Sequence, residues 1–95
     1  MDTITNHLFY VLECNDGSYY AGYTNNLERR VRVHNEGKGA KYTRAKLPVH
    51  CIYHEKHETQ RQAMQAEYRF KQLKRSEKEI YIAKGPGKDE VAKEC

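Results

Sequence analysis

The segment FYVLECNDGSYYAG, residues 9–22, predicts how the rest of the chain is organised. Its two ends are aromatic and β-branched, and the NDG between them, residues 15–17, is typical of a turn. The segment therefore predicts a β-hairpin. A two-residue loop would place Tyr10 and Tyr20 on opposite faces of the hairpin, whereas a three-residue loop with Gly17 at positive φ would place them on one face. We favour the three-residue loop, because a type I turn with a bulge needs glycine at its third position.

The favoured loop pairs Leu12 with Tyr20 and Tyr10 with Gly22. The two tyrosines then become diagonal neighbours about 6 to 8 Å apart, with open space expected beside Gly22. The opposite face is apolar and comprises Phe9, Val11, Tyr19, Ala21 and Tyr23. Two phenols beside a gap are a candidate site, and ordinary packing of strand tyrosines is the alternative that the residues leave open.

Length and composition limit the classes of protein. The chain has 95 residues, which is room for one domain with a modest core. It has neither an apolar run of about 18 residues nor a signal-peptide pattern, so we expect no membrane partner and a cytoplasmic location. Three cysteines, an odd number, suit reduced thiols. The net charge of +4 and a pI near 9.0 are compatible with a polyanionic partner.

A helix is predicted over residues 26–36, with Asn25 as its N-cap and Gly37 as its stop. Arg30 and His34 are four residues apart and lie along one edge of its buried stripe. Each has an ordinary alternative: a solvated helix arginine, and a last-turn histidine that favours the helix dipole.

Residues 36–44 are predicted to form an ordered, basic loop that could bind nucleic acid. Cations would contact phosphates and an aromatic ring would stack on a sugar or base. The candidate contact residues are Lys38, Lys41, Tyr42, Thr43 and Arg44. No Gly-Lys-Ser/Thr triplet ends the segment, which excludes a Walker A loop. A solvated surface connection is the alternative.

A third strand is predicted over residues 47–54, with Pro48 near its beginning. His50 and His54 would lie about 13 Å apart along it, too far to share a metal ion. The histidine-rich composition of this segment therefore does not predict a zinc site.

A long helical pattern runs from Thr59 to about Arg75. Glu67 lies inside its apolar stripe, where an unpaired carboxylate is costly to bury. A salt bridge or an edge position would explain it, and so would a metal ligand facing a cleft. Ser76 begins a predicted capping box for a separate helix over residues 77–83.

These residues together resemble the GIY-YIG nuclease superfamily. The tripeptides YVL at 10–12 and YAG at 20–22 are similar to its paired motif, although Leu, Phe and Ala replace three of the naming residues. Arg30 and His34 follow Tyr20 at the family's spacing, and Glu67 matches a helical glutamate after the third strand. The string GKGAKYTR at 37–44 is similar to the signature of small, stand-alone bacterial members.

The resemblance implies an α+β domain of order β-β-α-β-α-α, built on a three-stranded antiparallel sheet. We place this domain at residues 1–84 and expect a charged, disordered tail at 85–95. The implied activity is metal-dependent endonucleolytic hydrolysis of nucleic acid, with DNA favoured over RNA as the substrate, in repair or recombination. It would assign one Mg²⁺ or Mn²⁺ ion to Glu67, the phosphate to Arg30 and water activation to Tyr10. Tyr20 and His34 would orient or stabilise the reacting groups.

Two other classes stay open at this point. One is a nucleic-acid-binding module of the same fold that cleaves little or nothing. The other is a structural or protein-interaction domain, which would show no salt-dependent affinity for DNA or RNA.

Overall fold

The computed structural model of the protein describes residues 7–84. In chain order its elements are β1 (His7–Glu13), β2 (Tyr19–Thr24), α1 (Leu27–Asn35), α2 (Lys41–Arg44), β3 (His50–His57), α3 (Gln60–Lys71) and α4 (Arg75–Lys84). The strands form one antiparallel sheet in the order β2-β1-β3. The predicted α+β class and element order are confirmed, with the short helix α2 added inside the predicted loop. The tail predicted at 85–95 lies outside the described residues.

The β1–β2 hairpin has the predicted three-residue loop. Gly17 adopts φ +85°, which an L side chain rarely tolerates. Tyr10 lies opposite Gly22, and Leu12 lies opposite Tyr20. Tyr10 and Tyr20 therefore point from the same face of the sheet, as predicted.

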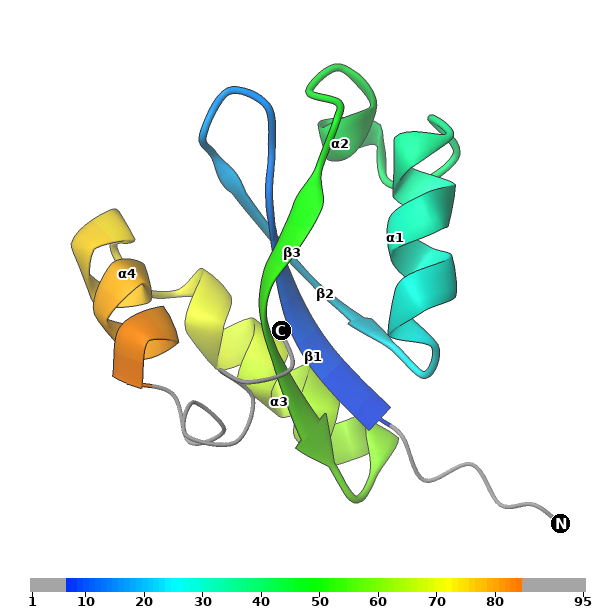
Figure 1. Ribbon diagram of the computed structural model, residues 1–95. Helices are drawn as coiled ribbons and strands as arrows, with labels where there is room; N and C mark the ends of the chain where they lie inside the picture. The colour runs from blue at the N-terminus through cyan, green and yellow to red at the C-terminus, as the bar shows by residue number, and fades with distance from the viewer. Residues whose placement is uncertain (1–6, 85–95) are drawn as a thin grey trace, which may run out of the picture.

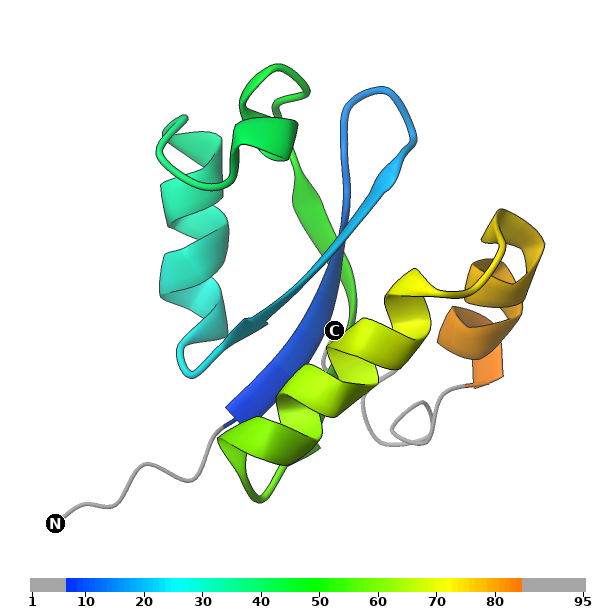
Figure 2. The same cartoon turned by 180° about the vertical axis from the view of Figure 1, so that it is seen from behind.

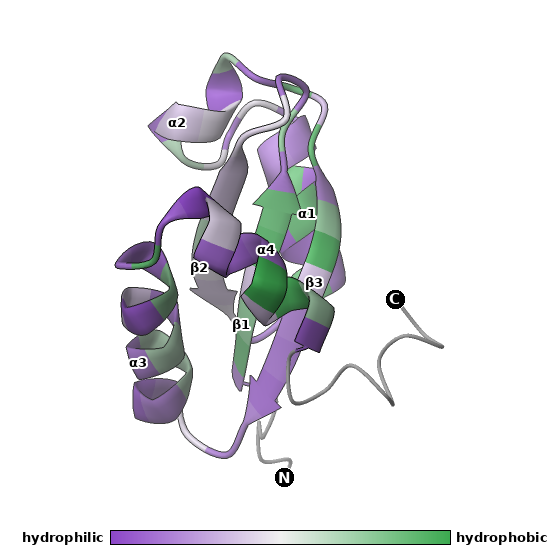
Figure 3. Cartoon of the chain, turned by 90° about the vertical axis from the view of Figure 1, so that its left-hand side faces the viewer, coloured by the Kyte–Doolittle hydropathy of each residue, from purple (hydrophilic) through white to green (hydrophobic). Residues whose placement is uncertain are grey.

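Strand β1 is the centre of the molecule. Helices α1 and α2 lie on one side of the sheet and α3 and α4 on the other (Figures 1 and 2). β1 carries hydrophobic residues along most of its length between β2 and β3 (Figure 3). A strand covered on both faces needs such a continuous apolar sequence, because alternate side chains enter two different layers.

The layer beneath α3 is the main hydrophobic core. It comprises Phe9, Val11, Ala21, Tyr53, Ala66 and Phe70. Phe9 is fully buried, and its ring lies 5.4 Å from that of Phe70 and 6.3 Å from that of Tyr81. Truncating such a residue costs about 3 to 5 kcal/mol, so Phe9 fixes both α3 and α4 on the sheet.

The layer beneath α1 is smaller and contains more polar atoms. Its buried members are Tyr10, Leu12, Cys14 and Val49, with Tyr20, Leu27, Val31, Leu47 and Cys51 packed against them. Because both hairpin tyrosines lie here, this second layer is where a site can form.

Three predicted boundaries need correction. Asn26, not Asn25, caps α1, because its side chain accepts the Arg29 N–H at 3.1 Å. Strand β3 begins at residue 50 instead of 47 and runs to 57. Its start is delayed because the Asn35 side chain satisfies both the N–H and the C=O of Val49, at 2.8 and 3.0 Å.

The predicted helices at the C-terminal end are shifted. Helix α3 ends at Lys71, before the predicted Arg75, and α4 begins at Arg75. The Lys74 N–H donates to Glu77 Oε1 at 2.8 Å, so Glu77 caps the N-terminus of α4. The capping box predicted from Ser76 is therefore wrong. Across residues 7–84, no helix is long and apolar enough to cross a bilayer.

Candidate active site

Tyr10 and Gly22 are in direct contact across the hairpin. A Cβ added at Gly22 would lie 2.6 Å from Tyr10 Oη, nearer than real Cβ atoms approach other atoms. The space expected beside Gly22 is therefore filled by the Tyr10 phenol. Any side chain at position 22 would displace that phenol.

Tyr10 and Tyr20 both pack against the His34 imidazole from α1. Tyr10 is 1% exposed and His34 is fully buried, and Tyr10 Oη lies 3.2 Å from His34 Nε2. The Tyr20 ring lies 5.3 Å from the imidazole at 62°. The structure thus brings three of the predicted site residues into one cluster.

The hydrogen bonds around His34 determine which ring nitrogen carries the proton. Thr43 Oγ1 donates its proton to the Ala40 carbonyl at 3.0 Å, so it must accept at its contact with His34 Nδ1, at 2.9 Å. His34 Nδ1 therefore carries the proton and Nε2 does not. The Tyr10 hydroxyl donates to Nε2, and a continuous chain runs from Tyr10 through His34 and Thr43 to the Ala40 carbonyl, just before α2.

Thr43 has a different role from the predicted one. Its side chain is fully buried and bonded to His34, so it cannot contact a nucleic acid. Gly39 allows this arrangement. A Cβ there would lie 2.3 Å from His34 Nδ1. The turn before α2 is thus packed directly onto the imidazole.

The protonation states in the cluster follow from burial and from one nearby cation. Burial raises the pKa of Tyr10 to about 12, against a lowering by the Arg30 guanidinium. Burial and then the Arg30 charge lower the pKa of His34 below its usual 6.5. At pH 7 both groups are neutral, with the phenol as donor and the imidazole as acceptor.

Arg30 lies at the edge of this cluster on α1. Its charge acts on both Tyr10 and His34, and its half-buried side chain also borders an open groove of about 310 Å³. The other residues lining that groove are Thr24, Asn25, Asn26, Arg29 and Val33. The Arg30 side chain therefore lies between the buried Tyr10 phenol and a groove that is open to solvent.

Glu67 lies on α3, near enough to Tyr10 for its charge to act on the phenol. Its negative charge is one of the influences that raise the pKa of Tyr10. The side chain is 17% exposed and accepts from Lys71 Nζ at 2.7 Å, one helical turn along. The anomalous carboxylate in the apolar stripe is therefore neutralised by a lysine that is itself half-exposed.

One divalent ion is compatible with this set of donors. Across residues 7–84, no group of three or more His, Cys, Asp or Glu side chains could hold a metal by itself. Mg²⁺ is usually held by one or two carboxylates together with waters and substrate phosphates. Glu67 fits as the single protein ligand of such an ion, once Lys71 has moved away from it.

A small aromatic and basic groove lies beside the cluster along β2. It has a volume of about 270 Å³ and is lined by Tyr19, Tyr20, Ala21, Tyr42, Phe70, Lys71 and Lys78. The Tyr20 and Tyr42 rings are stacked at 6.0 Å and 24°, and Lys46 Nζ lies 3.8 Å from the Tyr42 ring centroid. Aromatic faces next to ammonium groups can accept both the bases and the phosphates of a nucleic acid.

The predicted basic segment keeps its other candidates on the surface. Lys38, Lys41 and Arg44 are exposed, and Tyr42 is 43% exposed. They surround the turn that contacts His34. The groove residues not predicted from sequence are Lys71 and Lys78, of which only Lys71 had a local signal, its four-residue spacing from Glu67.

The chain is similar to known proteins over most of its length. Residues 6–81 match the family model described as the GIY-YIG catalytic domain. A UPF0213 protein of Bacillus cereus is 67% identical over 79 residues, covering 83% of this chain and 82% of the relative. The UPF0213 protein YazA of Bacillus subtilis is 60% identical over 77 residues, covering 81% and 78% respectively.

Two solution structures share the fold. The protein EF2693 from E. faecalis has a TM-score of 0.58 and 51% identity, covering 86% of this chain and 88% of that chain. The UPF0213 protein BH0048 from Bacillus halodurans has a TM-score of 0.53 and 43% identity, covering 85% and 88%. The chain therefore belongs to the GIY-YIG family, as its paired tyrosine motif predicts, and its relatives include the small bacterial UPF0213 proteins.

Proposed function

We propose that the protein is a metal-dependent endonuclease that hydrolyses phosphodiester bonds in DNA. The observation that carries the proposal is the hydrogen bond from the Tyr10 hydroxyl to His34 Nε2, at 3.2 Å, with Arg30 and Glu67 close enough to alter the pKa of Tyr10. A buried phenol, an acceptor imidazole, a guanidinium and a carboxylate together meet the needs of phosphodiester hydrolysis.

Each of the chain's own groups has a defined task. Arg30 binds the scissile phosphate and offsets the charge that develops on it. Tyr10 receives a proton from the attacking water as its own proton passes to His34 Nε2, which is unprotonated and therefore able to accept it. Tyr20 holds the imidazole from its other side. A Mg²⁺ or Mn²⁺ ion held by Glu67 would supply Lewis-acid stabilisation of the phosphate.

The substrate docks through the exposed basic residues around the cluster. Lys38, Lys41 and Arg44 contact the sugar-phosphate backbone, and Tyr42 stacks on a sugar or base. We place the activity in the cytoplasm, in DNA repair or recombination. The buried thiol of Cys14 suits a reducing compartment.

A cleavage panel tests the proposal. The purified protein would be incubated with end-labelled linear, branched and single-stranded DNA and with RNA, in Mg²⁺, Mn²⁺ or EDTA. We expect cleavage of at least one DNA with metal and none in EDTA, with a large loss in Tyr10→Phe. Cleavage by Tyr10→Phe at the wild-type rate would contradict the mechanism.

A second candidate is a nucleic-acid-binding module with little or no cleavage. The Glu67–Lys71 ion pair favours it, because Lys71 already neutralises the carboxylate that a metal would need. This candidate predicts salt-dependent DNA binding that is equal in Mg²⁺ and EDTA, with no product after long incubation.

A further inference from the structure

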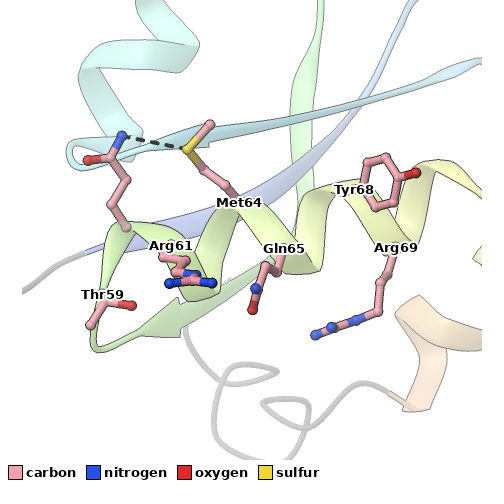
Figure 4. Close-up of a pocket in the computed structure, with 7 residues that line it drawn as sticks. Thr59, Arg61, Met64, Gln65, Tyr68 and Arg69 are labelled. Atoms are coloured by element: carbon pink, nitrogen blue, oxygen red, sulfur yellow. Dashed lines mark hydrogen bonds between the residues drawn. The ribbon is translucent and has the colours of Figure 1, made fainter.

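The solvent-facing side of α3 carries a groove that the candidate active site does not use. It is open, with a volume of about 990 Å³, and it is lined by Thr59, Gln60, Arg61, Met64, Gln65, Tyr68 and Arg69. Figure 4 shows these side chains on α3 and at its N-cap, with Met64 and Tyr68 directed to one edge of the helix and Arg61, Gln65 and Arg69 to the other. We call it the outer α3 surface.

Two parallel rows of side chains make up this surface. Gln60, Met64 and Tyr68 recur every four residues, with Gln60 Nε2 lying 3.6 Å from Met64 Sδ. Arg61, Gln65 and Arg69 form the second row at the same spacing. Met64 is 47% exposed and Tyr68 is 66% exposed. Large apolar surface left in water in this way marks an interaction site when it is contiguous and bordered by polar groups.

The charge of the lining residues is positive. None of the seven lining residues is acidic. Within residues 7–84, neither Arg61 nor Arg69 forms a salt bridge. The nearby carboxylates of Glu67 and Glu79 are paired instead with Lys71 and Arg75. The occupant that complements this surface is therefore a polyanion with flat, partly apolar groups.

We propose that the outer α3 surface is a second contact surface for nucleic acid, separate from the basic residues of the 36–44 segment. Arg61 and Arg69 bind phosphates of the same molecule, and Tyr68 and Met64 pack against its sugars or bases. This inference rests on the proposed function, because it extends the path of the substrate beyond the site.

The dimensions of α3 agree with such a path. The two arginines are eight positions apart in the sequence. This is about 12 Å along the helix axis, the axial rise of about three to four nucleotides. The last turn of α3 supplies Phe70 and Lys71 to the groove along β2. A strand that leaves that groove therefore meets the same helix that carries the outer surface.

A second copy of this chain fits the surface less well. Two α3 helices packed antiparallel about Gln65 would set Arg61 of one copy against Arg69 of the other, with no carboxylate in the groove to separate them. Like charges in contact disfavour that dimer. An acidic protein is the remaining alternative, and the experiment below distinguishes it.

The test compares Arg61→Ala/Arg69→Ala with Lys56→Ala/Lys84→Ala, which removes the same charge from exposed positions on β3 and α4. Binding of a defined duplex DNA and of poly-glutamate would be measured in EDTA over a series of salt concentrations. We expect the slope of log affinity against log salt to fall by about two in the arginine variant, and by much less in the control. Tyr68→Ala should weaken binding at every salt concentration and leave the slope unchanged.

Equal slopes for the arginine variant and the control would overturn the inference. So would a loss of poly-glutamate binding without a loss of DNA binding, which would point to an acidic protein. Cleavage measured in parallel separates the two proposals. If the wild type binds DNA through the arginines but does not cut it, the proposed contact surface stands and the proposed nuclease activity is refuted. If the wild type cuts DNA and the arginine variant has the same salt slope as the control, the nuclease proposal stands and the contact surface is refuted.

Discussion

The backbone of Gly39 touches the imidazole of His34 so closely that a Cβ at position 39 would lie 2.3 Å from Nδ1. The contact joins the turn before α2 to the ring that accepts the Tyr10 proton. No flexible side chain lies between them, so the position of the imidazole depends on the path of the backbone at residue 39.

Gly39→Ala should therefore displace His34 and reduce cleavage by about tenfold or more, because a positioned proton acceptor contributes about 10² to 10⁴. Gly37→Ala is the matched control: Gly37 has φ +79°, but a Cβ there meets nothing within 4 Å. The control should lose about 1 kcal/mol of stability while keeping its activity. Equal activity of the two variants in single-turnover assays would contradict the contact's role.

Thr43→Val should separate the orientation of His34 from the packing around it. Valine has nearly the same shape as threonine but cannot accept a hydrogen bond from the His34 Nδ1–H. The tautomer with an unprotonated Nε2 is therefore no longer favoured by this bond. We expect at least about tenfold slower cleavage, with unchanged affinity for DNA measured in EDTA. Thr43→Ser should restore most of the rate, and a serine variant as slow as the valine one would refute this explanation.

Replacing Tyr10 with Phe should change how stability depends on pH. The pKa of Tyr10 is raised from 10.0 to about 12 by folding, so its neutral form contributes stability that is complete below pH 10 and is lost as the pH rises towards 12. Denaturant melts of wild type should therefore weaken between pH 10 and 12 more than those of Tyr10→Phe. At pH 7 the variant should be less stable by about 1 to 3 kcal/mol, because His34 Nε2 loses its donor. Parallel pH dependences would show that Tyr10 titrates normally in the folded protein.

Glu67→Ala should reduce cleavage strongly while changing stability little. Its partner Lys71 is half-exposed and can return to water, so the loss should stay within about 1 kcal/mol. Glu79→Ala, which breaks the exposed Arg75–Glu79 pair at the same four-residue spacing, is the control and should keep full activity. Metal-dependent cleavage by Glu67→Ala at the wild-type rate would remove Glu67 from the metal site. A destabilisation of about 3 kcal/mol or more would indicate a buried structural pair instead.

The basic segment can be tested by removing its three exposed cations. A triple alanine variant at Lys38, Lys41 and Arg44 should flatten the slope of log affinity against log salt by about two to three. A triple variant at Arg32, Lys56 and Lys84, which are also exposed, controls for net charge. If both triple variants show the same slope, DNA is not held by this segment.

The sequence predicted the hairpin well because its information is local. Gly17 in the third loop position sets the turn, the turn sets the register, and the register places Tyr10 and Tyr20 on one face. The contact of Arg30 and His34 with that face followed from helical spacing and from resemblance to the family. These features depend on neighbours in the chain or on a known pattern.

The parts that could not be predicted depend on contacts between distant segments. Thr43 belonged to a polar, basic string, and only the packing of α2 against α1 shows that its hydroxyl is buried on His34. The late start of β3 likewise depends on Asn35, fourteen residues before Val49. Lys78 reaches the groove from a separate helix, and no spacing rule connects it to Tyr20.

Because β1 is the central strand, its register with β2 and β3 decides which of its side chains reach the candidate site. Phe9 and Val11 enter one layer, and Tyr10 and Leu12 enter the other. A shift of β1 by one residue would exchange the two sets, putting a phenolic hydroxyl under α3 and a phenyl ring against His34. A misaligned chain would retain a compact, apolar interior of similar volume, yet it would have no proton donor for the imidazole. Under the proposed function, selection for activity at this site is also selection against compact states of the wrong alignment, which selection for stability alone would tolerate.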